Sequence, residues 1–323
     1  MTAATAPVDR AAPRARRSRS QTTSAVAALL LLVVANALFT PNFATAGNLW
    51  NVLLQTSTVT LVAVGMTLVI ATGGIDLSVG SVMAIAGALA ATRLEGGGGV
   101  LVAIVAGLVG ALVVGALNGL LVARDRIQPI VVTLATLIAG RGLAQVLSDD
   151  GQLVPIRDAA FFVLGRGRVG PVPAPVIVAA VVVAIAAFAL HAMPFGRYVL
   201  AAGGNPAAAR LAGVPVKRTL ITVYALSGLL AGVAGLLEAS RLGASDAAKI
   251  GLNIELDAIA ATVVGGTALV GGRATIVGTV VGALVMQVIA TSFNMLLIPY
   301  AWSLALKAVI ILAAVFAQRP KRV

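Results

Sequence analysis

Long apolar stretches, each close to the length that crosses a bilayer, follow one another from residue 24 to residue 317 with only short polar intervals. A helix needs about 20 predominantly apolar residues to span the hydrocarbon core. The mean hydropathy of +1.04 and the charged fraction of 11% lie far outside the range of soluble domains. Backbone groups in lipid must bond within their own segment, so we predict an all-α, polytopic membrane protein.

The length criterion predicts about ten transmembrane helices. They cover residues 24–39, 51–72, 77–92, 100–123, 127–147, 172–192, 219–240, 255–270, 275–294 and 299–317. Segments 77–92 and 255–270 are short and rich in glycine, which predicts broken or only partly crossing helices. Residues 24–317 therefore form a single transmembrane domain. The first span also fits a secretory signal peptide, so whether it is cleaved stays open.

Positive charge is distributed unevenly about these spans. Residues 1–23 carry five arginines without apolar periodicity and are predicted to be a disordered tail, and residues 318–323 are a short basic tail. With the N-terminus inside, fifteen Lys and Arg residues lie on the cytoplasmic side and six outside. The six are Arg93, Arg157, Arg166, Arg168, Arg241 and Lys249. Since Lys and Arg are retained inside, both termini and loop 194–218 are expected in the cytoplasm, and the net charge of +12 needs no nucleic-acid partner.

Loop 194–218 is a polar interval that contains the signals of a short helix. Asn205 can cap free backbone N–H groups, Pro206 suits the first helical position, and Gly213 can close the helix. About two turns lie between them, too few to be stable alone in water, so the helix is expected to dock against something. We interpret it as a partner contact at the membrane surface; the alternative is an ordinary solvated loop.

Two glycine motifs interrupt the apolar pattern. Gly73, Gly74 and the following residues to Gly80 read G-G-x-x-L-x-x-G, as do Gly265, Gly266 and the residues to Gly272. Corresponding glycine interruptions in two halves of a membrane protein indicate an internal repeat with a pathway between the halves, although four identities in glycine-rich sequence can also arise by chance. The first motif also holds Asp76 and Ser78.

Polar side chains within the spans are candidates for helix caps or for a solute path. Asp76, Glu255 and Asp257 stand where apolar runs begin, so capping is the preferred role, and substrate contact is the alternative. Side chains that could bond hydroxyl groups along a hydrated path, or could join neighbouring helices, are Asn118, Thr133, Gln145 and Asn294. No Ser-His-Asp set, H-E-x-x-H pair, cysteine or metal-ligand cluster occurs, so neither an enzyme nor a metal site is predicted.

Four long motifs resemble the membrane permeases of bacterial ATP-binding cassette (ABC) importers for monosaccharides, the ribose-type group. They are GMTLVIATGGIDLSVGSVMAIAGA (65–88), GRYVLAAGGNPAAARLAGV (196–214), YALSGLLAGVAG (224–235) and ELDAIAATVVGGTALVGGR (255–273). The resemblance covers about residues 48–315, and IQPIVVTLATLIAGRGLAQ (127–145) is most similar to galactofuranose-type members. Which sugar is carried is not readable from these motifs.

The resemblance implies a permease subunit in the cell membrane with three kinds of protein partner: an ATPase, an extracytoplasmic sugar-binding protein, and a second permease copy or paralogue. The chain has no P-loop, so ATP and Mg²⁺ are expected on the ATPase, with no cofactor in this chain. The loop that contacts the ATPase in similar permeases matches Gly203, Gly204, Asn205, Pro206, Ala208, Arg210 and Gly213. A proton- or ion-coupled secondary transporter and a passive channel remain the alternatives.

Overall fold

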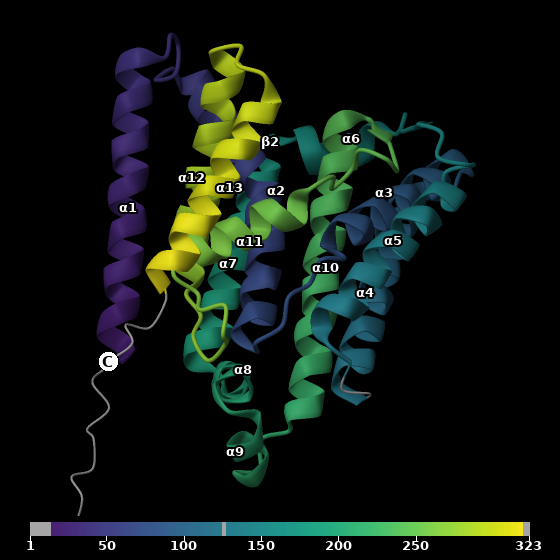
Figure 1. The fold of residues 1–323 in the computed structure, drawn as a ribbon. Coiled ribbons are helices and arrows are strands. Elements are labelled where there is room, and N and C mark those ends of the chain that lie inside the picture. Colours follow the sequence, from purple (N-terminus) through teal and green to yellow (C-terminus); the bar gives the residue numbers. More distant parts are fainter. Residues whose placement is uncertain (1–13, 125–126, 319–323) are drawn as a thin grey trace, which may run out of the picture.

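The computed structural model describes residues 14–124 and 127–318, and it is predominantly helical (Figure 1). The first helices are α1 (Arg14–Phe39), α2 (Ala46–Ala71), α3 (Val79–Glu95), α4 (Gly99–Arg124), α5 (Pro129–Leu147), α6 (Ala159–Arg166) and α7 (Ala174–Ala192). The others are α8 (Pro194–Gly204), α9 (Pro206–Leu211), α10 (Val216–Leu242), α11 (Ile254–Val264), α12 (Ile276–Met295) and α13 (Tyr300–Gln318). Each predicted span thus corresponds to a helix.

The structure also contains four two-residue strands, which the all-α prediction did not include. β1 (Val154–Pro155) pairs antiparallel with β4 (Ala244–Ser245), and β2 (Arg168–Val169) pairs antiparallel with β3 (Val172–Pro173). These ribbons satisfy backbone groups in the loops at the end of the bundle that carries α6. The predicted disordered tail over residues 1–23 lies outside the described residues as far as residue 13, and residues 14–23 form the start of α1.

Helix α10 runs through the middle of the bundle and packs against α2, α3, α4, α6 and α8. Small residues allow the closest of these contacts. A Cβ atom added at Gly115 of α4 would lie 3.0 Å from Cα of Gly228 on α10, so the two backbones touch. Such small-residue crossings are how helices associate in lipid, where apolar side chains gain little by leaving the hydrocarbon.

Seven described helices are long and apolar enough to cross a membrane: α2, α4, α5, α7, α10, α12 and the Thr22–Phe39 part of α1. The other three predicted spans are shorter. α3 has 17 residues, α11 has 11, and the apolar part of α13 covers Ala301–Ala314. At 1.5 Å per residue, α11 extends about 16 Å, roughly half of the hydrocarbon thickness. The prediction that segments 77–92 and 255–270 are broken or partly crossing is therefore confirmed for α11.

A non-helical linker precedes each of the short helices α3 and α11. Residues 72–78 lead from α2 into α3, and residues 243–253 lead from α10 into α11 (Figure 1). The first linker starts at the end of the bundle that carries α8 and α9, and the second starts at the opposite end. Backbone outside helices is tolerated at membrane depth only where protein or water satisfies it. Both linkers are therefore places where polar side chains are expected to gather.

Candidate functional site

The predicted short helix in loop 194–218 is present as α9. The Asn205 side chain accepts hydrogen bonds from the N–H groups of Ala207 (3.1 Å) and Ala208 (3.0 Å), and Pro206 is the first helical residue. Gly213 has a φ of 79°, a left-handed conformation that suits glycine at a helix end. The sequence did not reveal α8, which precedes α9 and makes the loop a pair of short helices.

α9 lies beyond the rest of the bundle and presents an uncovered face (Figure 1). Ala209 packs with Ala202 and Val216, which attaches α9 to α8 and α10. On the other side Ala208 and Arg210 are exposed, and Leu211 is 91% exposed. A leucine this exposed outside the membrane spans, on a helix too short to stand alone, indicates a surface built to be covered. Leu211 was missed in the sequence because it completes an ordinary PAAARL pattern.

Three segments far apart in the chain meet by main-chain contact at this end of the molecule. We call the contact of Ala71, Gly73, Gly203, Gly271 and Gly272 the glycine junction. The Gly272 N–H donates to the Ala71 carbonyl (2.9 Å). A Cβ atom at Gly203 would collide with the Ala71 carbonyl oxygen, and one at Gly271 would lie 2.8 Å from the Gly203 oxygen and 2.9 Å from the Gly73 nitrogen. The end of α8 thus touches the end of α2 and the second glycine motif directly, whereas Gly204 has room.

The two G-G-x-x-L-x-x-G motifs consequently lie side by side. The first follows α2 and the second follows α11, and Gly73 and Gly271 are in contact at the glycine junction. Within the second motif, Gly265 packs against Gly278 of α12, and Gly266 has a φ of 97°. The structure therefore brings Gly73 of the first motif and Gly271 of the second together at the α8 end of the bundle, and a pathway between the halves stays a prediction. Whether they descend from an internal repeat stays a prediction.

Asp76 organises linker 72–78 from a nearly fully buried position, with 1% of its surface exposed. One carboxylate oxygen accepts hydrogen bonds from the Ser78 N–H (3.1 Å) and hydroxyl (2.6 Å). The other accepts from the Ser227 hydroxyl of α10 (2.8 Å). The N-cap position of α3 belongs to Ser78, so Asp76 is not the cap residue itself but bonds the cap residue's N–H. The pattern stabilises a non-helical linker inside the bundle.

Two of the four polar residues proposed for a path extend this network. The Asn118 amide on α4 donates to the Ser78 hydroxyl (2.9 Å), and the Thr133 hydroxyl on α5 bonds the Ile75 carbonyl (3.1 Å). Both are buried, at 1% and 0% exposure. Gln145 and Asn294 are exposed residues near helix ends and are not brought to the same place. Asn118 and Thr133 therefore hold helices together around the linker.

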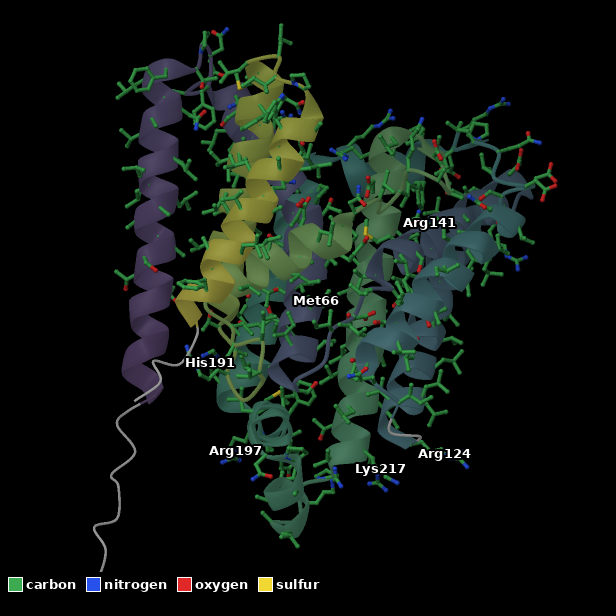
Figure 2. The ribbon with its side chains drawn as sticks, viewed as in Figure 1. Met66, Arg124, Arg141, His191, Arg197 and Lys217 are labelled. Atoms are coloured by element: carbon green, nitrogen blue, oxygen red, sulfur yellow. The ribbon has the colours of Figure 1, made fainter. Side chains whose placement is uncertain are left out.

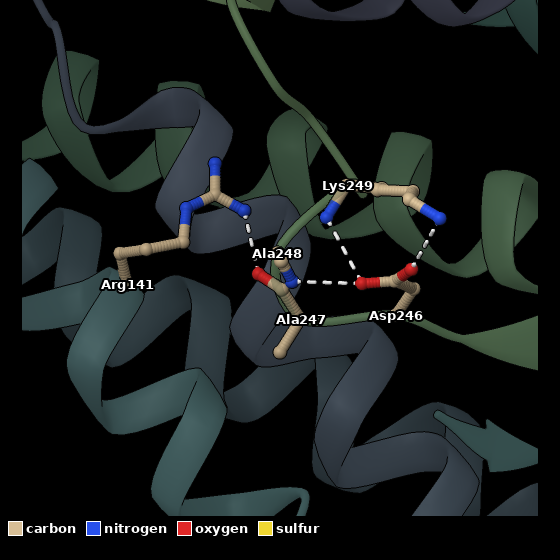
Figure 3. A network of polar contacts seen from close by, with 5 residues as sticks. All are labelled: Arg141, Asp246, Ala247, Ala248 and Lys249. Carbon is tan, nitrogen blue, oxygen red and sulfur yellow. Dashed lines mark hydrogen bonds and ion pairs between the residues drawn. The ribbon is translucent and has the colours of Figure 1, made fainter. Parts of the chain in front are cut away.

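Arg141 of α5 holds the second linker. Its guanidinium donates to the carbonyl oxygens of Ala247 (2.8 Å) and Ile250 (2.7 Å) (Figure 3). In the same linker, Asp246 accepts from the N–H groups of Ala248 (3.0 Å) and Lys249 (3.2 Å). A cation that would be costly in lipid is thus satisfied by carbonyl groups that no helix uses.

Glu255 and Asp257 lie in the first turn of α11, as predicted. Asp257 accepts two hydrogen bonds from Lys307 of α13, at 2.7 and 3.0 Å, so the second cation within the spans is also paired. Glu255 is buried, and one of its oxygens has no hydrogen-bond partner in the described part of the chain. Residues 14–124 and 127–318 contain no cluster of three or more His, Cys, Asp or Glu side chains that could hold a metal ion.

Comparison with known proteins gives one family and a consistent set of relatives. The model of the family described as branched-chain amino acid transport system / permease component matches residues 48–315. The ribose import permease protein RbsC of Escherichia coli K12 is 42% identical over 301 residues, which are 91% of this chain and 92% of the relative. The galactofuranose transporter permease protein YtfT of the same strain is 38% identical, over 90% of this chain and 87% of the relative.

A third relative carries another sugar name. The L-arabinose ABC transporter permease protein AraH of Azospirillum brasilense is 38% identical over 297 residues, which are 92% of this chain and 87% of the relative. No solved structure matches the chain.

Proposed function

Because the chain belongs to the family of the branched-chain amino acid transport system permease component, we propose that α8 and α9 form the surface through which a separate ATPase drives it. The chain is the membrane-spanning permease subunit of an ABC importer for sugars, and it lies in the cell membrane as a multi-pass protein. It is not itself an enzyme. ATP and Mg²⁺ are bound by the partner.

The observation that carries the proposal is the uncovered face of α9, which ends at the exposed Leu211. α9 is fixed to the bundle by Ala209 below it, and α8 is fixed to α2 and to the loop after α11 through the glycine junction. A partner that moves α9 must therefore move the backbone next to both glycine motifs. Alternating access would follow as a rocking of packed helices when the ATPase dimer closes and opens.

The proposal extends to the topology and the assembly. The chain makes ten passes, with both termini in the cytoplasm and α9 on the ATPase side. Arg124, Arg197 and Lys217 lie at the end of the bundle that carries α9, which supports this orientation because Lys and Arg are retained inside (Figure 2). The short passes are α3, α11 and α13, with linkers 72–78 and 243–253 completing the first two. A second permease copy or a paralogue would form the other half, and a sugar-binding protein would deliver solute at the opposite end. The solute is a monosaccharide, in keeping with the ribose, galactofuranose and L-arabinose relatives.

The test combines partner capture with uptake. Ala208→Glu puts a charge on the exposed face of α9, and Leu211→Asp removes its apolar contact. Each change should leave insertion intact, weaken ATPase association about 30-fold or more, as for a hot-spot residue, and abolish sugar uptake. The controls at the same positions, Ala208→Ser and Leu211→Met, should behave like wild type.

The readouts are co-purification of the ATPase in mild detergent and uptake of labelled ribose, L-arabinose and leucine by cells. A wild-type level of co-purification and uptake for Ala208→Glu would show that α9 is not the coupling surface. Uptake of leucine in place of both sugars would overturn the solute class and leave the coupling surface standing.

A further inference from the structure

A cavity of about 330 Å³ opens at the α9 end of the bundle. Of the glycine junction, Gly73 lines it, whereas Gly271 and Gly272 do not. Its walls come from six places: linker 72–78, the end of α4, the start of α5 with the two residues before it, the end of α8, α9, and the start of α10. This volume lies at the lower end of the range of about 300–1,000 Å³ that small-ligand sites occupy. Pro206 and Arg210 of α9 line this space, whereas Ala208 and Leu211 on the outer face of α9 and the buried Asp76 do not.

The lining of the cavity favours an anion. Arg210 of α9 and Lys217 of α10 both line it, and the described lining residues include no Asp or Glu. Thr72 and Gln128 add neutral hydrogen-bonding groups. The remaining wall is apolar, with side chains such as Val122, Ile127 and Leu220. A site with cations at one side and an apolar wall at the other suits a ligand that carries both a charge and a hydrocarbon part.

Tyr224 supplies a second and independent indication of a ligand. It lines the cavity next to Gly74, against which its hydroxyl packs, and its side chain is 0% exposed. Within the described part of the chain, this hydroxyl has no hydrogen-bond partner. Buried hydroxyl groups are almost always bonded, so this unpaired one calls for a partner. A phosphoryl oxygen can accept that bond once the contact with Gly74, which closes the hydroxyl off from the cavity in this structure, opens.

From the cavity, its two cations and the unpaired Tyr224 hydroxyl, we propose that this is a binding site for a phosphate-bearing anion, supplied either by an anionic phospholipid headgroup or by free phosphate. Basic pockets between helices at the cytoplasmic membrane surface are typical sites for anionic headgroups. α4 and α5 lie at the outside of the bundle, with only 22% of each apolar window buried, so acyl chains can lie against them. The ligand would join α9, α10 and linker 72–78.

The experiment measures binding to the purified, delipidated full-length chain in neutral detergent. Three probes are compared: phosphatidylglycerol, phosphatidylcholine and inorganic phosphate, each titrated while retention by native mass spectrometry and the melting temperature are recorded. Phosphatidylglycerol should bind and raise the melting temperature, and phosphatidylcholine should not. Competition by inorganic phosphate at similar concentration would assign the site to free phosphate; failure to compete would assign it to the lipid. Either result supports a binding site for a phosphate-bearing anion.

Two variants localise the site. Lys217→Gln should weaken anion binding about tenfold or more, because a hydrogen bond to a charged group is lost. Its matched control is Arg218→Gln, which removes the neighbouring positive charge on α10 but no residue of the cavity wall. Tyr224→Phe removes a hydroxyl that is unpaired in the ligand-free chain, so its melting temperature without ligand should be no lower than wild type, while the anion-dependent rise should shrink.

Three results would overturn the proposal: equal responses to phosphatidylglycerol and phosphatidylcholine with none to phosphate, an equal loss of binding in Lys217→Gln and Arg218→Gln, or an undiminished response in Tyr224→Phe. The first means no anion selectivity. The second assigns binding to diffuse surface charge, and the third places the anion elsewhere. None of these readouts depends on the ATPase or on the transported solute. The anion site and the coupling surface are therefore tested independently.

Discussion

The buried Asp76 carboxylate accepts three hydrogen bonds, two from Ser78 and one from Ser227. In Asp76→Asn the nitrogen that replaces one oxygen can only donate, so the Ser227 hydroxyl must change from donor to acceptor and every bond loses its charged acceptor. Since hydrogen bonds to charged groups contribute about 1.5–3 kcal/mol each, we expect the melting temperature of the purified permease to fall by several degrees. Thermal unfolding in detergent is the measurement.

Asp158 provides the matched control for the Asp76 substitution. It caps α6 by accepting from the N–H groups of Ala160 (2.8 Å) and Phe161 (3.3 Å) in a half-buried position. Asn caps helices about as well as Asp, so Asp158→Asn should melt like wild type. If Asp76→Asn also melts like wild type but sugar uptake is lost, Asp76 acts in transport and not in holding the linker.

Side-chain roles were predictable where the signal is local. Asn205, Pro206 and Gly213 lie within nine residues, and their cap, first-turn and left-handed roles follow from the chemistry of each residue type. The bond between Asp76 and Ser227 joins residues 151 positions apart, and nothing in one sequence indicates that pairing. For the same reason Asn118 and Thr133 could be identified as polar residues in spans, but not as partners of linker 72–78.

α8 transmits force only if its end stays in contact with α2. Gly203→Ala would place a methyl group against the Ala71 carbonyl, so α8 must shift away and the glycine junction opens. We expect uptake to fall at least tenfold while the ATPase still co-purifies, because the outer face of α9 is unchanged. Gly204→Ala is the control one position along: its Cβ would have Gly272 Cα at 3.9 Å, an ordinary contact, so uptake should be retained.

The outcome that contradicts the transmission role is normal uptake with Gly203→Ala. Loss of ATPase binding in this variant would instead show that Gly203 shapes the docking surface itself.

Helices were the most predictable elements, because spans need continuous apolar length. α8 was not predicted, since its sequence PFGRYVLAAGG contains polar residues and three glycines that resemble a loop. Its helical form depends on packing against α2, α7 and α10, which is tertiary information.

The two ends of the whole molecule differ in charge, which the sequence alone could indicate. Basic residues at the α8 and α9 end include Arg124, Arg197 and Lys217 (Figure 2). The opposite end carries α6 and the two strand pairs. The number of full crossings could not be read from hydropathy, because linkers 72–78 and 243–253 replace part of a helix with backbone that other helices satisfy.

The orientation of the bundle can be tested directly, because the chain contains no cysteine and a single introduced thiol is therefore unambiguous. Leu211 on α9 is 91% exposed and Val169 in β2 is 68% exposed, so each can react once it is cysteine. If Lys and Arg retention sets the orientation, Val169→Cys should be labelled in intact cells by a membrane-impermeant maleimide. In cells that lack the ATPase, which would otherwise cover this face of α9, Leu211→Cys should be labelled only after the cells are permeabilised. Labelling of Leu211→Cys alone in intact cells would place α9 outside, where no ATPase could reach it.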